Sequence, residues 1–108
     1  MPPVLPKKTR FEVPTKGKKK YVAIVPVRST NGASAGTIRV GFGHRDYQQY
    51  EDVVPKSMGG GRWSKKNHHD AKRRRSYRAR HGGVLCKNGE PCISVRYSAA
   101  WFSYYFLW

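Results

Sequence analysis

Acidic side chains are scarce in this chain of 108 residues, which has six Asp and Glu against 22 Lys and Arg and a formal net charge of +16. Acid–base catalysis needs paired titratable groups, and Asp46, Glu51 and Asp52 lie in a stretch without a partner base. No phosphate loop, nucleophile elbow or zinc-protease helix motif occurs in the sequence. We therefore expect a protein that is not an enzyme, with no cofactor and no small-molecule substrate.

Cysteine is nearly absent as well, because Cys86 and Cys92 are the only two. Their separation of six positions is wider than the spacing of about two to four found in zinc knuckles, so no metal site is expected. A two-residue turn at Asn88-Gly89 would place the two sulfurs on opposite faces of a hairpin. Only a three-residue loop or a bulge would align them for a disulfide. We expect two free, half-buried thiols, with the disulfide as the alternative.

Long hydrophobic runs are also missing. The longest apolar stretch begins at Ala99 and is half of the roughly 20 residues that cross a bilayer, and residues 1–6 lack the apolar region of a signal peptide. We expect no membrane span and synthesis in the cytosol. With a hydrophobic fraction of 38%, the core must be small and must depend on aromatic side chains.

Positive charge is concentrated in two segments, residues 1–20 and 62–81. A nearly neutral body with two basic segments indicates contact with nucleic acid or with an acidic protein surface, although a solvated basic surface is a further alternative. Arginine binds phosphates and carboxylates equally well. The candidate contact residues are the basic side chains Lys18, Lys19, Lys20, Lys72, Arg73, Arg74, Arg75, Arg78 and Arg80.

The pattern of the chain predicts an α+β fold: an extended basic arm over residues 1–20 and a small single domain over 21–108. Four prolines disfavour a helix in the arm. Alternating residues predict a β-hairpin over 21–42 with Asn31-Gly32 in its loop. A second hairpin is expected over 84–97, with its turn at residues 87–90.

Two helices are predicted in the second half of the chain. Asp70 is a good N-cap for a basic helix from Ala71 to about Arg80, which Gly82 or Gly83 would end. Ser98 would cap a short aromatic helix over 99–107. That helix either packs on its own domain or anchors in a neighbouring protein, through the aromatic residues Trp101, Phe102, Tyr105, Phe106 and Trp108.

The position of Trp108 at the end of the sequence suggests a further contact. Its carboxylate would be costly to bury without a partner. We expect the indole to be buried and the carboxylate to reach water or an arginine, from this chain or from a neighbour.

The basic segment 70–81 and the aromatic segment 100–108, preceded by Phe42-Gly43, Asp46-Tyr47 and Tyr50, resemble a family of small uncharacterised basic proteins. Large double-stranded DNA viruses of algae and protists encode that family, in the nucleocytoplasmic group that includes the chlorella viruses. The likeness extends over roughly residues 40–108 and implies a viral setting. It implies no catalytic residue.

Together these observations favour a structural component of a large assembly, most simply a minor capsid protein in the virion. Its partners would be major and minor capsid proteins. The alternative is a nucleic-acid-binding protein, associated with a viral genome or with the ribosome of an organelle, and located in an organelle or the nucleus.

Overall fold

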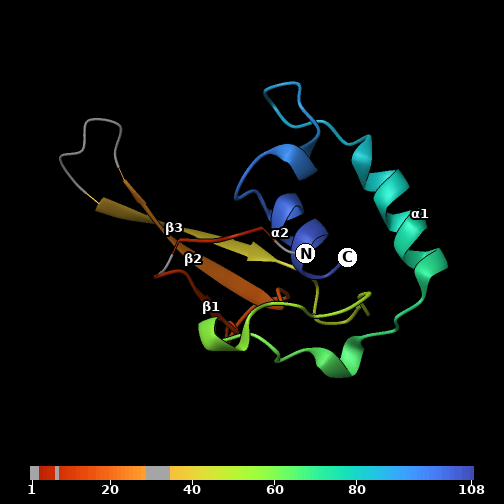
Figure 1. Cartoon of the computed structure of the whole chain (residues 1–108), viewed down its shortest axis with the longest axis horizontal. Coiled ribbons are helices and arrows are strands. Elements are labelled where there is room, and N and C mark those ends of the chain that lie inside the picture. The colour runs from red at the N-terminus through yellow and green to blue at the C-terminus, as the bar shows by residue number, and fades with distance from the viewer. Residues whose placement is uncertain (1–2, 7, 29–34) are drawn as a thin grey trace.

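The computed structural model describes residues 3–6, 8–28 and 35–108, which form a small α+β domain. Its sheet is antiparallel with strand order β1–β2–β3, built from β1 (Arg10–Glu12), β2 (Tyr21–Arg28) and β3 (Ala35–Phe42) (Figure 1). The hairpin predicted over 21–42 is confirmed, because Tyr21 pairs with Phe42 and Arg28 with Ala35. The expected turn at Asn31-Gly32 lies outside the described residues.

The N-terminal segment was expected to be an arm outside the domain, and in the structure some of its described residues join the sheet and the core. It is extended, as the prolines predicted, but β1 pairs with β2 through residues 22–24 and so adds a third strand. Leu5, Thr9 and Phe11 are buried. A small domain has few apolar side chains, and it gains burial by drawing on this segment. Pro26, which has no N–H group, lies beyond the end of β1.

Both predicted helices are confirmed. Helix α1 (Ala71–Gly82) begins at Asp70, whose carboxylate accepts hydrogen bonds from the N–H groups of Lys72 and Arg73, and Gly83 follows its end. Helix α2 (Ala99–Phe106) begins at Ser98, whose hydroxyl accepts from the Trp101 N–H group. Three short 3-10 turns complete the described elements: η1 (Lys56–Met58), η2 (Ser64–Lys66) and η3 (Cys92–Ser94). None of the helices in the described residues is long and apolar enough to span a bilayer.

Cys86 and Cys92 form a disulfide, so the expectation of free thiols is wrong. The turn differs from the predicted one: Cys86 N–H bonds to the Glu90 carbonyl, and Leu85 pairs with Pro91. The loop therefore contains three residues, 87–89, which places both sulfurs on one face. This register is the one that a disulfide requires. The second hairpin expected over 84–97 is therefore reduced to the single β-bridge between Leu85 and Pro91, which η3 follows in the chain.

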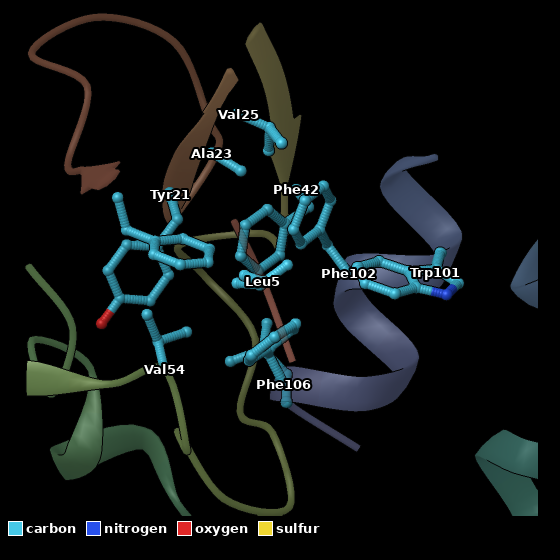
Figure 2. Close-up of a cluster of buried hydrophobic side chains, with 11 residues drawn as sticks. Leu5, Tyr21, Ala23, Val25, Phe42, Val54, Trp101, Phe102 and Phe106 are labelled. Atoms are coloured by element: carbon cyan, nitrogen blue, oxygen red, sulfur yellow. The ribbon is translucent and has the colours of Figure 1, made fainter. Parts of the chain in front are cut away.

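The core lies between α2 and the sheet, and rings dominate it (Figure 2). Phe102 stacks on Phe42 with ring centroids 5.1 Å apart, and Phe11 meets Phe102 edge to face at 6.0 Å. The aromatic segment thus packs on its own domain. The buried hydrophobic residues are Leu5, Phe11, Tyr21, Ala23, Ile24, Val25, Phe42, Val54, Trp101, Phe102, Phe106 and Leu107. Tyr105 lies outside this core and is 38% exposed.

Replacing Phe102 by alanine should lower the free energy of unfolding by about 3–5 kcal/mol, because a fully buried ring leaves a cavity among five other rings. The control is Tyr105→Ala on the same helix, which should cost about 1 kcal/mol or less. Urea denaturation of both variants measures the difference. Equal losses would contradict the placement of the core.

A candidate nucleic-acid interface on helix α1

Helix α1 has two faces of different character, and none of its residues is fully buried. Its inner face is half-buried and contains Arg74, Tyr77, Arg78 and His81. Its outer face is exposed and carries Lys72, Arg73, Arg75, Ser76, Ala79 and Arg80. Because the helix has no apolar stripe, polar and aromatic contacts must hold it on the domain.

The inner face is held by Trp108. The ring of Tyr77 stacks on the indole with centroids 4.3 Å apart and planes within 4°. The main-chain oxygen of Trp108 accepts hydrogen bonds from Arg74 Nε at 2.8 Å and from Arg78 Nε and Nη2 at 3.2 and 3.0 Å. An arginine contact at this residue was expected, and both arginines come from this chain. The indole itself is half-buried.

The same two arginines also lie over aromatic rings. The guanidinium of Arg74 is 4.6 Å from the centroid of Tyr50, and that of Arg78 is 4.8 Å from the centroid of Tyr104. Arg74 and Arg78 were expected to bind an external polyanion or an acidic partner. In the structure both side chains are engaged within the domain, and their binding to an outside partner remains a prediction.

The outer face keeps its positive charge without acidic partners. In the part of the chain that the structure describes, the ion pairs are Arg39–Glu12 and His44–Asp46, and neither involves α1. Arg73 donates a hydrogen bond to the neutral Oε1 of Gln48. Lys72, Arg73, Arg75 and Arg80 therefore remain available for an external anion.

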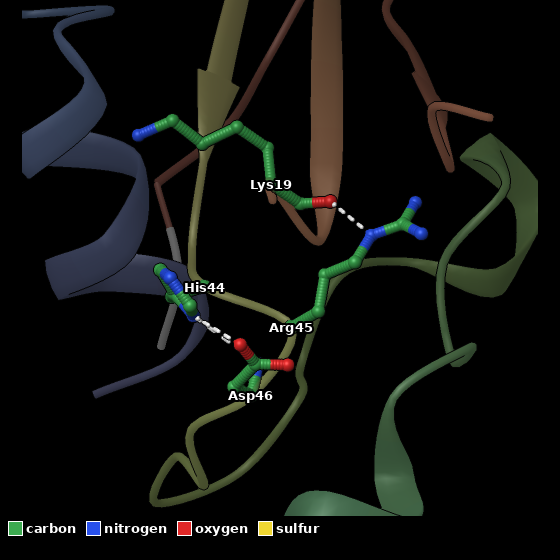
Figure 3. Close-up of polar contacts among 4 residues, drawn as sticks. All are labelled: Lys19, His44, Arg45 and Asp46. Carbon is green, nitrogen blue, oxygen red and sulfur yellow. Dashed lines mark hydrogen bonds and ion pairs between the residues drawn. The ribbon is translucent and has the colours of Figure 1, made fainter. Parts of the chain in front are cut away.

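A groove of about 650 Å³ runs beside the helix. Arg73, Tyr77 and Arg80 line it on one side. The other side is lined by Lys19, Gly43, His44, Asp46, Tyr47 and Gln48. Arg45 Nε donates to the Lys19 carbonyl at 3.0 Å and His44 Nδ1 lies 3.9 Å from Asp46, which ties this second wall together (Figure 3). The hydrogen bond from Arg73 to Gln48 also joins this wall to α1.

The positive charge of the groove at neutral pH comes from its arginines and lysines, and the carboxylate of Asp46 in the lining opposes it. Partial burial lowers the pKa of His81 below its ordinary value of 6.5, and the neighbouring Arg80 lowers it further. His81 is therefore neutral at pH 7. Across the groove the ring of Tyr47 is 67% exposed and lies 4.6 Å from that of His44.

Lys20 does not belong to the basic surface, which corrects its expected role. Its side chain is buried, and its Nζ donates a hydrogen bond to Gln49 Oε1. Burial lowers the pKa of Lys20 from 10.5 to about 8, with a further lowering from Lys66 and an opposing effect of Asp52. Lys18 and Lys19 are exposed, as a contact surface requires.

A buried polar network around Asp52 positions the start of α1. Its carboxylate accepts from the Tyr21 hydroxyl at 2.5 Å and from the Trp63 N–H group at 2.9 Å. Gln49 Nε2 donates to Asn67 Oδ1 at 2.7 Å, and the His68 N–H group bonds to the Gln49 carbonyl. The network joins the sheet to the segment that leads into the helix. Sequence reasoning missed it, because single polar residues in an irregular segment carry no periodic signal.

No group of three or more His, Cys, Asp or Glu side chains within the described ranges is arranged to hold a metal ion. Comparison with known proteins finds no match, whether among family models, curated proteins or solved structures. The resemblance to the viral family therefore remains a prediction.

The two arginines of the inner face should matter for stability more than those of the outer face. The double variant Arg74→Ala, Arg78→Ala loses three hydrogen bonds and two cation–π contacts and should lower the free energy of unfolding by about 1–3 kcal/mol. Thermal unfolding followed by tryptophan fluorescence measures this loss. The matched control Arg73→Ala, Arg75→Ala should stay within about 0.5–1 kcal/mol of the parent, and a larger loss there would overturn the assignment of the faces.

Stability should rise between about pH 8 and 10 and then fall. Below pH 8 Lys20 is charged in both states, and between 8 and 10.5 the folded state binds fewer protons than the unfolded state, so unfolding becomes less favourable. Burial and the hydrogen bond to Asp52 raise the pKa of Tyr21 above its ordinary value of 10, which reverses the slope at higher pH.

Urea denaturation across this pH range tests both effects. Lys20→Met should abolish the rise above pH 8, whereas Lys19→Met, which removes an exposed lysine, should keep it. If the free energy of unfolding still rises above pH 8 in Lys20→Met, burial of Lys20 is not the cause of the rise.

Proposed function

We propose that this protein binds nucleic acid through the outer face of α1 and the groove beside it. The observation that carries the proposal is the exposed set of basic residues on one helix face, which has no acidic partner in the described residues. Lys19 extends the positive surface across the groove, and Lys18, the preceding residue, is exposed as well. Phosphates at regular spacing along a backbone suit such an array.

Nucleic acid fits this surface better than an acidic protein does. Arginine binds phosphate and carboxylate equally well, so charge alone leaves both partners open. The groove adds the exposed ring of Tyr47 to the basic side chains. Nucleic acids present flat bases next to their phosphates, whereas an acidic protein surface offers carboxylates alone.

A structural role in a virion is the second candidate, and one feature favours it. Val84 and Leu85 are 47% and 62% exposed on the segment that enters the disulfide loop, and they offer an apolar contact to a protein neighbour such as a capsid subunit. The buried aromatic segment, by contrast, leaves little for an anchor in a neighbouring subunit. This role remains a prediction.

Binding to a fluorescent 20-base-pair duplex at 50 and 200 mM salt tests the proposal. Four to six phosphate contacts would reduce the association constant by roughly 150–1,800-fold over this range, because each contact releases a condensed counterion. The variant Lys72→Ala, Arg75→Ala should weaken binding and lower the slope of log K against log salt by about 2.

The matched control is Lys8→Ala, Arg10→Ala, which removes the same charge near β1, at the opposite side of the molecule from α1 (Figure 1). It should change the slope little. Absence of binding at 50 mM salt, or equal effects of the two double variants, would refute the proposal.

A further inference from the structure

We propose that the preferred ligand is double-stranded DNA, and that α1 enters its major groove with the outer face first. This inference rests on the proposed function and specifies its ligand. It follows from the position and length of the helix, from the order of side chains around its exposed face, and from the stacking of the aromatic rings beside the groove.

The first observation is the position of α1. Figure 1 shows it at the rim of the molecule, with its length free along the side away from β1. Its 12 residues give a length of about 18 Å. The major groove of B-form DNA is about 12 Å wide and admits a helix of this kind, whereas the major groove of A-form RNA is deep and narrow and does not.

The second observation is the order of residues around the exposed face. At 100° per residue, Lys72, Ser76 and Ala79 lie along its middle line, with Lys72 in the first turn. Arg75 lies on one side of this line and Arg73 and Arg80 lie on the other. The small residues let the helix approach the base edges closely. The arginines on both flanks can reach the phosphates of both groove walls.

The third observation concerns the rings beside the groove. Tyr77 stacks on Trp108 at 4.3 Å and on His81 at 4.0 Å. Two rings stacked this closely must cover opposite faces of Tyr77, so no face is left for a base. Trp108 also meets the ring of His68 at 5.2 Å. Binding of single strands depends on a series of free ring faces, and Tyr77 and Trp108 do not provide them. The exposed ring of Tyr47, across the groove, is a single stacking surface.

The contacts that hold α1 on the domain also favour binding to a duplex. The stack on Trp108 and the bonds from Arg74 and Arg78 hold α1 before any ligand arrives. A helix that is already formed and docked loses little conformational freedom on binding. Lys19, across the groove from α1, is then placed to meet a phosphate beside the occupied major groove.

A competition experiment tests the inference. The protein is bound to a labelled DNA duplex, and unlabelled DNA duplex, RNA duplex and single-stranded DNA of equal length and sequence compete. DNA duplex should compete at least about tenfold better than the other two, because it alone gives the helix a wide groove. Equal competition by single strands or by RNA duplex would overturn the inference and leave the proposed function standing. Failure to bind any of the three would refute both.

A bulky neutral residue on the middle line separates groove entry from simple charge attraction. Ala79→Trp should weaken binding to the DNA duplex about tenfold or more and change binding to single strands by less than about threefold. The control Ala99→Trp places the same residue at another exposed helical alanine and should change neither. Should Ala79→Trp lower the melting temperature, Ser76→Trp on the same line replaces it. Unchanged duplex binding by the folded variant would contradict groove entry.

Discussion

The fold depends on how a helix without an apolar face is held on a small domain. Helix α1 has no buried residue, and the positively charged side chains of its outer face repel one another. Trp108 supplies the attachment: its indole stacks on Tyr77, and its main-chain oxygen accepts from Arg74 and Arg78. Phe106 and Leu107 of the same segment are in the core, so the helix is tied directly to the most buried part of the molecule.

This attachment divides the basic residues into two groups with different tasks. Arg74 and Arg78 are four positions apart and would repel each other on a free helix. In the structure a shared main-chain oxygen and the rings of Tyr50 and Tyr104 offset that repulsion. The residues between and beside them face outward, and their charge is left for a partner. One short segment therefore holds the helix on the domain and, in the proposed function, also binds the ligand.

The sequence predicted the elements whose signals are local. Asp70 and Ser98 predict the starts of the two helices, because a helix cap needs only a single side chain. The alternation of apolar and polar residues predicts the β2–β3 hairpin. Contacts between distant segments were missed or misjudged. Neither the strand pairing of β1 nor the burial of Lys20 against Gln49 leaves a periodic trace, and the disulfide depended on a one-residue change of turn length. The sequence also did not show which arginines face inward, because their orientation depends on the position of Trp108 in the folded domain.

The central claim is that the inner arginines hold the helix while the outer ones meet the ligand. Nuclear magnetic resonance of the arginine Nε–Hε groups during titration with a DNA duplex reports on each side chain separately. We expect the signals of Arg73, Arg75 and Arg80 to shift, while those of Arg74 and Arg78, already bonded to Trp108, stay in place. Large shifts of Arg74 and Arg78, with the outer arginines unchanged, would contradict the account.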